Sequence, residues 1–504
     1  MKRTKYQIVV VSVIFLTILS GSFSAIQAKK NQNVADRQIL SGMHSISSHI
    51  LFKTVKELCS KKYGGRLTGT PGYNSAAAWV SETLKKMGIK PAGDSHSYLQ
   101  AFPNPYTLVY EGSEATLHIA MSNNQILLKP YMYETDFIPG STSDTGEVTS
   151  EVIYVGYGIT APELGFDEYK DIDVKGKIVL MEPEVPVSPE KEPGLFKKWR
   201  KYSFHQYKVR NAKDHGAAGM LYNYHIANPN CQFIDDFILT YAGPAMITDL
   251  FLGTGRNHRR IKQKIRSSRT SQSFRTGKVI SLKNHTEHHP DGIAYNVIGI
   301  LEGKDPKMIN KAIIIGAHLD HVGCNHKLMP GANDNASGVA VVLSVARALT
   351  GLPFPLNRSI VFILFGAEEQ GVVGSQFYVK HPVFPNKDIM AFINMDGVGR
   401  GKKIWALAAQ NFPQIWNYFK NSNKQWIHRD IDTEYFHNLA RPRLDAARFM
   451  WAGIPTISFS TYGEAELPYS VYHKTLDTPD IITPEIMEDL AQLIYMAVVK
   501  MAGY

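Results

Sequence analysis

The feature that most constrains this chain is a series of short, almost wholly apolar runs in its second half. Three of them are Ala312–Ala317 (AIIIGA), Ser359–Ala367 (SIVFILFGA) and Asp388–Met395 (DIMAFINM). Runs of this length that lack polar alternation are typical of strands buried on both faces in a parallel sheet. A sheet of that kind needs helices on both sides, because each apolar face must be covered.

Acidic and histidine side chains stand directly after these runs. His318 follows the first run, the pair Glu368 and Glu369 ends the second, and Asp396 follows the third. In open α/β sheets, binding sites form in the crevice outside the carboxyl ends of the strands. We therefore expect these side chains to converge, although they are far apart in the chain.

The alternation of strand and helix continues through most of the second half of the chain. The pattern predicts further strands at Asn296–Leu301 and Thr456–Phe459, and helices at Gly338–Leu349 and Met487–Met501. Two earlier helices are expected at Ser48–Cys59 and Asn74–Met87. The predicted fold class is α/β, with one doubly wound, mostly parallel sheet and helices on both faces.

At 504 residues the chain is too long for one ordinary core, so more than one folding unit is expected. The stretch from Ser141 to Lys278 contains strands, a helix and another strand but no cluster of metal-binding side chains. We expect it to form a smaller α/β or β-rich unit inserted into the parent sheet. The predicted organisation is a signal peptide at 1–28, the first part of the main domain at 29–140, the insert at 141–280 and the catalytic part at 281–504.

The N-terminus has the composition of a secretory signal peptide. Lys2, Arg3 and Lys5 precede an apolar run of about 12 residues, and small residues lead to Ala25 and Ala28. Roughly 20 apolar residues are needed to span a bilayer. We therefore expect export to the periplasm or the extracellular space after cleavage, with no membrane span left in the mature protein.

The basic residues and the cysteines give two further signals. The formal charge is +10, and nine Lys or Arg residues lie between Arg256 and Lys278. One interpretation is a patch that binds nucleic acid. Ile261 and Ile265, at helical spacing, favour instead a surface helix whose basic side chains face the solvent. We therefore expect no nucleic-acid partner. Three cysteines do not make a disulfide framework, and Cys324 has no partner cysteine nearby in the sequence.

The residue types after the strands fit a pair of divalent metal ions. Carboxylate oxygens and imidazole nitrogens are ligands of zinc, and the chain offers both kinds in His318, Asp334, Glu369, Asp396 and His473. Two divalent ions and three carboxylates leave one positive charge, which a bound hydroxide neutralises. Asp334, in the tight loop Gly331–Gly338, is suited to bridge the two ions, which would lie about 3.5–4 Å apart.

Neighbouring side chains have different tasks in this interpretation. Glu368 and Glu369 point in opposite directions at a strand end, so one can bind metal while the other moves a proton. Asp320 can hold the ring of His318 through its second nitrogen. Tyr472 offers a hydroxyl to a developing oxyanion, although a packed tyrosine at the rim fits its position equally well. His321 and His326 are expected to be supporting or loop residues.

Each of these motifs has an ordinary structural interpretation when taken alone. A single His-x-Asp or Glu-Glu is usually surface or hydrogen-bonded structure, Asp334 can be a helix cap, and Asp396 can be a turn residue. Several acids and a histidine at successive strand ends are hard to produce by accident. Jointly they predict a metallohydrolase.

At these residues the chain resembles the di-zinc exopeptidases of metallopeptidase family twenty-eight. The matching motifs follow the family's order and are Gly316–His321 (GAHLDH), Gly331–Gly338 (GANDNASG), Ala367–Gly371 (AEEQG), Asn394–Gly399 (NMDGVG) and Tyr472–Thr478 (YHKTLDT). The likeness also covers Gly65–Val80 and Asp445–Pro455. One departure is that Arg443–Phe449 lacks the Ser-Asp-His core common in that stretch.

The resemblance implies a zinc exopeptidase fold and a role for each matching residue. It implies that His318 and Asp396 hold one zinc, that Glu369 and His473 hold the other, and that Asp334 bridges them. It also implies Glu368 as the general base and Asp320 as the orienting partner of His318. The insert resembles a protease-associated domain.

The function expected from these observations is an exported exopeptidase that cleaves peptide or protein substrates at one chain end, with the amino end favoured. A carboxypeptidase of the same family is an alternative, because Arg441, Arg443 and Arg448 stand where a carboxylate clamp can form. A glutaminyl cyclase, which works with a single zinc, and a non-catalytic binding ectodomain are further alternatives. The oligomeric state is not readable from the sequence.

Overall fold

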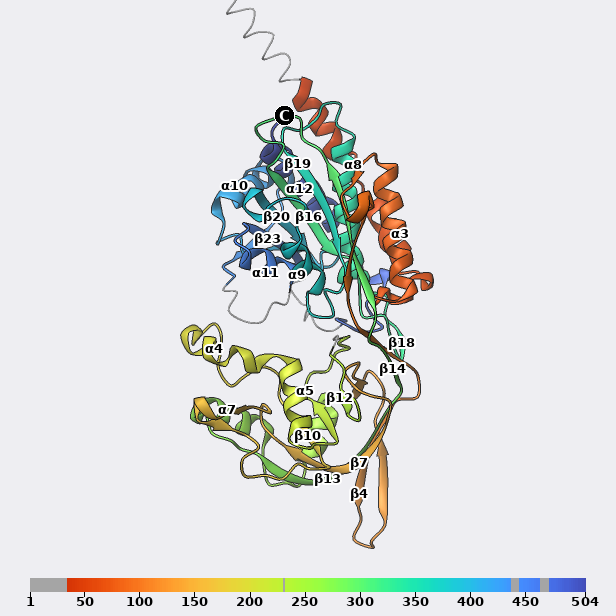
Figure 1. The fold of residues 1–504 in the computed structure, drawn as a ribbon, viewed down its shortest axis with the longest axis vertical. Coiled ribbons are helices and arrows are strands. Elements are labelled where there is room, and N and C mark those ends of the chain that lie inside the picture. Colours follow the sequence, from red (N-terminus) through yellow and green to blue (C-terminus); the bar gives the residue numbers. More distant parts are fainter. Residues whose placement is uncertain (1–33, 230–231, 437–443, 463–470) are drawn as a thin grey trace, which may run out of the picture.

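The computed structural model describes residues 34–229, 232–436, 444–462 and 471–504. The expected signal segment 1–28 lies outside the described residues. The chain forms two units, each built on its own large sheet, and they appear one above the other in Figure 1. None of the helices among the described residues has the length and apolar character of a membrane span.

The first unit contains a nine-stranded sheet. Its order is β1 (Lys90–Pro91), β15 (Ile293–Leu301), β19 (Ser359–Phe365), β16 (Ala312–His318), β20 (Ile389–Met395), β23 (Thr456–Tyr462), β21 (Lys403–Leu407) and β22 (Ile431–Glu434), with β2 (Leu99–Pro103) also paired to β15. The four central strands, β19, β16, β20 and β23, are parallel. Antiparallel pairs join β15 to β19 and β21 to β23. The predicted α/β class is confirmed, and the parallel pairing is concentrated in the centre of the sheet.

Helices cover both faces of this sheet, as expected. One face is covered by α2 (Ser48–Leu58), α3 (Pro71–Lys86), α8 (Ser337–Thr350) and α12 (Pro484–Ala502), whose side chains share a core with Ile313 and Ile315. The other face is covered by α9 (Val373–Lys380) and α11 (Asp445–Trp451), whose Tyr378 and Phe449 pack with Ile314. Successive residues of β16 therefore point to opposite cores.

The four predicted helices are present, but α3 begins at Pro71, three residues before the expected start at Asn74. Thr70 precedes α3 and its hydroxyl accepts the Tyr73 amide hydrogen, while Pro71 occupies the first turn. Helix α8 is buried almost all round, which explains why its sequence shows no polar face. In α7 (His258–Ser268), Ile261 and Ile265 are buried, so the basic stretch does form a surface helix there.

The second unit contains an eight-stranded sheet. Its order is β5 (Ile126–Pro130), β4 (Glu114–Ala120), β13 (Phe274–Asn284), β7 (Gly146–Tyr154), β10 (Ile178–Met181), β11 (Gly219–Tyr222), β12 (Ile238–Ala242) and β6 (Phe137–Pro139). Helices α4 (Pro193–Trp199), α5 (His205–Asp214) and α6 (Pro244–Phe251) complete the unit with α7. The sheet begins at Glu114, upstream of Ser141, because β4 pairs with β13, β6 pairs with β12, and β5 pairs with β4.

A small sheet joins the two units. Strands β3 (Tyr106–Val109) and β14 (Thr286–His289) pair with each other, and β3 also contacts β17 (Cys324–Asn325), which pairs with β18 (Lys327–Leu328). In Figure 1, β14 and β18 lie between the two large sheets. Since β17 and β18 follow His318 closely in sequence, this junction places the second unit next to the loops at the strand ends.

Candidate metal centre

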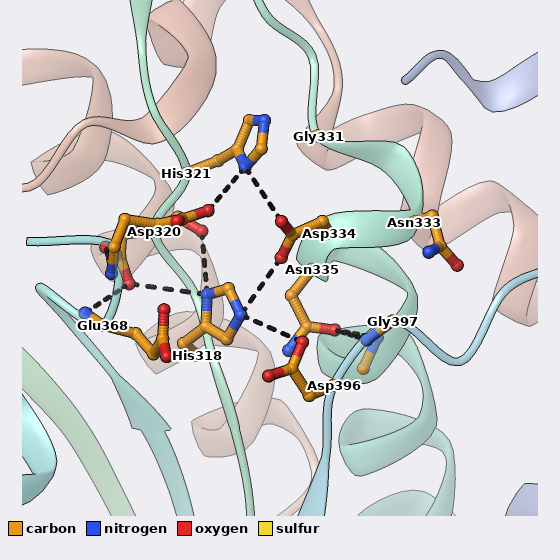
Figure 2. Close-up of polar contacts among 12 residues, drawn as sticks. His318, Asp320, His321, Gly331, Asn333, Asp334, Asn335, Glu368, Asp396 and Gly397 are labelled. Atoms are coloured by element: carbon orange, nitrogen blue, oxygen red, sulfur yellow. Dashed lines mark hydrogen bonds and ion pairs between the residues drawn. The ribbon is translucent and has the colours of Figure 1, made fainter. Parts of the chain in front are cut away.

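The carboxyl ends of β16, β19 and β20 bring the predicted residues together. His318 is the last residue of β16, Glu368 and Glu369 follow β19, and Asp396 follows β20. Asp334 lies in the segment Ala332–Ala336 that leads into α8. Figure 2 shows His318, Asp334 and Asp396 pointing toward one another from these different elements.

The first cluster of donor atoms is formed by His318, Asp334 and Asp396. His318 Nε2 lies 3.2 Å from Asp334 Oδ1 and 3.5 Å from Asp396 Oδ1. The other ring nitrogen, Nδ1, donates to the backbone carbonyl of Asp320 at 3.2 Å. Because Nδ1 is engaged in this hydrogen bond, Nε2 is the ring nitrogen that faces the two carboxylates.

The second cluster shares Asp334 with the first. His473 Nε2 lies 2.7 Å from Glu369 Oε2 and 3.2 Å from Asp334 Oδ2. His321 joins them, since its Nδ1 lies 2.9 Å from Glu369 Oε1 and 3.9 Å from Asp334 Oδ2. One donor atom from each of His321, Asp334, Glu369 and His473 falls within a mutual distance of 4.8 Å.

Asp320 supports the glutamate pair as well as His318. Its carboxylate accepts the backbone N–H groups of Glu368 and Glu369, each at 3.2 Å. The same carboxylate lies 3.7 Å from His318 Nδ1, while the Asp320 carbonyl is the nearer partner at 3.2 Å. Asp320 therefore ties the end of β16 to the end of β19.

Two residues to which the sequence assigned no role hold the Asp334 loop in place. Asp477 accepts the backbone N–H groups of Asn333 and Asp334 at 2.8 and 3.0 Å. The fully buried Arg66 donates to the carbonyls of Leu58, Leu319, Pro330 and Gly331 at 2.8–2.9 Å. Both lie inside stretches that carried the family resemblance, so a sequence signal existed, but neither stands at a strand end.

The second unit contacts the segment that carries His473. His473 Nδ1 donates to the carbonyl of Ala227 at 2.5 Å. The Glu134 carboxylate accepts both the backbone N–H and the hydroxyl of Thr475, with distances of 2.6 and 2.7 Å. Residues from before and within the insert thus fix the ring of His473 so that Nε2 faces the second cluster.

Burial and charge act in opposite directions on these groups. Burial opposes a charged His318, but the hydrogen bonds and charges of Asp320, Asp334 and Asp396 prevail and raise the pKa of the imidazole well above its ordinary value. Burial raises the pKa of Glu368 well above its ordinary value, and the carboxylates of Asp445 and Glu369 add to this against the charge of His318. Burial also raises the pKa of Asp445 to about 7.

The donor set fits divalent metal ions. The two clusters consist of imidazole nitrogens and carboxylate oxygens, and they share one carboxylate, which is the arrangement a two-metal site needs. Asp334 Oδ2 and His473 Nε2 are buried and, among the described residues, neither is in hydrogen-bonding geometry with a partner. Buried polar atoms without such partners are rare unless something else satisfies them, and a cation between them would do so.

The remaining residues that the sequence suggested for the site are not members of either donor cluster. Tyr472 stacks on the ring of His473 with centroids 3.9 Å apart. Arg441 and Arg443 lie outside the described residues, and the guanidinium of Arg448 lies over the ring of Trp451 at 5.5 Å from its centroid. His326 stacks on Tyr133 and belongs to neither cluster.

Comparison with known families identifies the part of the chain that carries these clusters. Residues 296–498 match the sequence model of peptidase family M28. This range includes every residue of the two clusters.

Curated relatives are similar over larger parts of the chain. An aminopeptidase of Pseudomonas aeruginosa is 26% identical over 353 residues, which make up 68% of this chain but only 56% of the relative. Aminopeptidase YwaD of Bacillus subtilis is 26% identical over 470 residues, covering 89% of this chain and 83% of the relative. The chain thus spans little more than half the length of the Pseudomonas protein.

Solved structures share the fold. An aminopeptidase from Aneurinibacillus sp. strain AM-1 superposes with a TM-score of 0.64 at 22% identity, covering 92% of this chain and 95% of the other. A zinc aminopeptidase from Bacillus subtilis gives a TM-score of 0.57 at 20% identity, with coverages of 91% and 96%. Both match nearly the whole chain, so the two-unit architecture is common to them.

Proposed function

Because the chain belongs to peptidase family M28 through residues 296–498, we propose that it is an exported di-zinc aminopeptidase. The observation that carries the proposal is the pair of donor clusters that share Asp334, with Glu368 beside them. The names of the relatives agree with this activity. Its substrates are peptides or proteins with a free amino end.

Five side chains would hold the two zinc ions. His318 and Asp396 would bind the first ion, Glu369 and His473 the second, and Asp334 both. When bound, zinc supplies a Lewis acid that polarises the scissile carbonyl and lowers the pKa of water. The hydrogen bonds from His318 Nδ1 and His473 Nδ1 to backbone carbonyls keep each Nε2 available as a ligand.

Glu368 is the proton carrier in this proposal. It follows β19 next to a ligand, it is buried, and its main chain is held by Asp320. The carboxylate takes a proton from the attacking water, becomes neutral, and delivers the proton to the leaving amine, so that peptide cleavage ends with the ionised carboxylate restored for the next cycle. Tyr472, stacked on His473, would donate its hydroxyl to the oxyanion.

Charge at the site favours the amino end over the carboxyl end. Asp445 is a buried carboxyl group beside the clusters, and carboxylates bind an ammonium group, whereas a substrate carboxylate needs Arg or Lys. The guanidinium of Arg448, the described member of the three candidate arginines, lies over Trp451. A carboxypeptidase is therefore the weaker alternative.

The organisation and location of the protein complete the proposal. In this proposal residues 29–140 and 281–504 make up the peptidase domain except for β4, β5 and β6, and these three strands join residues 141–280 in an inserted protease-associated domain. The N-terminal segment 1–28 directs export. The contacts of Ala227 and Glu134 with the His473 segment support a role for the insert beside the site.

The test uses aminoacyl-p-nitroanilides and N-blocked dipeptides, with and without a chelator. We expect hydrolysis of the free-amine substrates alone, loss of activity with the chelator, and recovery with Zn²⁺. Glu368→Gln should lower kcat by about 10²–10⁴-fold and still bind two zinc ions. Glu302→Gln, which changes an exposed carboxylate paired with Lys90, is the matched control. Fewer than two zinc ions per chain in the wild type, or an active Glu368→Gln variant, would refute the proposal.

A further inference from the structure

The second donor cluster contains one more imidazole than the proposed function needs. His321 is fully buried, and its Nδ1 faces the same space as the donor atoms of Glu369, Asp334 and His473. Figure 2 shows its ring directed at Asp334 from the loop that follows β16. The sequence alone predicts that His321 is a supporting or loop residue.

The separations within this cluster suit a single small cation. Zinc bonds of about 2.1 Å in a tetrahedral arrangement put neighbouring ligand atoms about 3.4 Å apart. In the structure, His473 Nε2 lies 2.7 Å from Glu369 Oε2 and 3.2 Å from Asp334 Oδ2. His321 Nδ1 lies 2.9 Å from Glu369 Oε1 and 3.9 Å from Asp334 Oδ2. These separations lie on both sides of the expected value. One donor atom from each of the four residues lies within 4.8 Å of the others, so small side-chain adjustments can place these atoms around one ion.

The backbone around His321 holds the ring in this position. Gly331 has a φ of +60°, and a Cβ there would lie 2.4 Å from His321 Cγ. The Asp334 loop can therefore press against the imidazole because residue 331 has no side chain. The second ring nitrogen, Nε2, is buried and has no hydrogen-bond partner among the described residues. Among the described residues, therefore, none holds the ring through Nε2 in an orientation that would turn Nδ1 away from the cluster.

We propose that His321 is a fourth protein ligand of the metal position formed by Asp334, Glu369 and His473, so that the two metal positions are unequal. Four protein ligands are typical of closed zinc sites, whereas three leave a place for water or substrate. The position of His318, Asp334 and Asp396 then stays open to substrate, and the other retains its ion. This inference rests on the proposed two-metal function.

The first experiment measures zinc affinity at each position of the full-length holoprotein by competition with a chromophoric chelator. We expect the wild type to bind two zinc ions and to lose one much more readily than the other. His321→Ala should weaken the tighter ion by roughly 100-fold or more, since loss of a residue that merely supports a ligand already costs 10–100-fold. His321→Asn should behave in the same way, although its amide nitrogen can replace Nδ1 as a donor to Glu369.

His326→Ala is the matched control, because His326 lies in the same loop but stacks on Tyr133 at 4.4 Å. X-ray absorption of the zinc-loaded wild type gives an independent measure that needs no variant. We expect three imidazoles for two zinc ions, and two in His321→Ala.

The outcomes separate this inference from the proposed function. Wild type with fewer than two zinc ions would refute the two-metal function itself. Two zinc ions in the wild type with unchanged affinities in His321→Ala, or full affinity in His321→Asn, would overturn the ligand assignment alone. Full affinity in His321→Asn would mean that His321 only positions Glu369 by a hydrogen bond.

Discussion

Arg66 offers a severe test of how the metal loops are held. Its guanidinium donates to four carbonyls, of which Leu319 lies between His318 and Asp320 and Gly331 begins the Asp334 loop. We predict that Arg66→Met leaves these carbonyls buried without their donor and lowers the free energy of unfolding.

The magnitude follows from the number of contacts. A hydrogen bond from a charged donor contributes about 1.5–3 kcal/mol, so four of them give an upper bound of about 6–12 kcal/mol. Water entering the cavity and relaxation of the loops offset much of this. We expect a net loss of at least about 3 kcal/mol, which is large beside the roughly 5–15 kcal/mol of a typical domain. Arg66→Lys, which has fewer donors, should recover part of the loss.

The assay is urea unfolding followed by tryptophan fluorescence, together with zinc retention against a chelator at low urea. Arg275→Met is the control, because Arg275 is exposed and its partner Glu151 keeps a second cation, Lys177, at 3.8 Å. An ion pair with an exposed partner contributes about 0–1 kcal/mol. Arg66→Met should unfold at lower urea than the control and release zinc faster in its folded state. Equal unfolding midpoints and equal zinc retention for the two variants would refute the reasoning.

Three further predictions concern the insert, pH and metal. Glu134→Gln keeps one acceptor for Thr475 and should speed zinc release by about 10-fold. The control is Glu147→Gln on the surface. Equal release rates in the two variants would argue against a role for the contact between Glu134 and Thr475. Burial raises the pKa of Glu168 to about 8 from 4.5, so its stabilising contribution is complete below pH 4.5 and is lost as the pH rises through about 8. Glu168→Gln should therefore gain stability relative to wild type between pH 5 and 8, by about 1.4 kcal/mol per pH unit, and a difference in melting temperature that does not change with pH would contradict this. Zinc at 100 times its Kd should stabilise the chelated protein by about 2.7 kcal/mol, which thermal unfolding at two zinc concentrations can check.

The strand ends could be predicted because buried parallel strands appear in the sequence as short, continuous apolar runs. The runs before His318, Glu368 and Asp396 have the lengths and positions of β16, β19 and β20. The carboxyl ends of parallel neighbours necessarily meet at one edge, so the convergence of their side chains followed from pattern alone. The antiparallel pairing of β15 with β19 and of β21 with β23 could not be predicted, because an apolar run does not indicate the direction of its strand.

Other features of the site depend on contacts that leave no local pattern. His321 was assigned to the loop because a histidine three residues after a ligand gives no indication of where its ring points. The sheet of the second unit begins at Glu114, and no composition change near that position marks it. Arg66 and Asp477 act through main-chain atoms of distant loops, which only the folded structure brings together.

The bond between His473 and the Ala227 carbonyl has a consequence for how this protein can be dissected. Its acceptor is a peptide oxygen that every amino acid carries, so replacing residues one at a time along the insert would not reveal it. The two partners are separated by 246 positions, and a shortened chain limited to residues 281–504 would contain the histidine without its acceptor. A small rigid shift of the insert would change the orientation of the ring while leaving every side chain of the catalytic half intact.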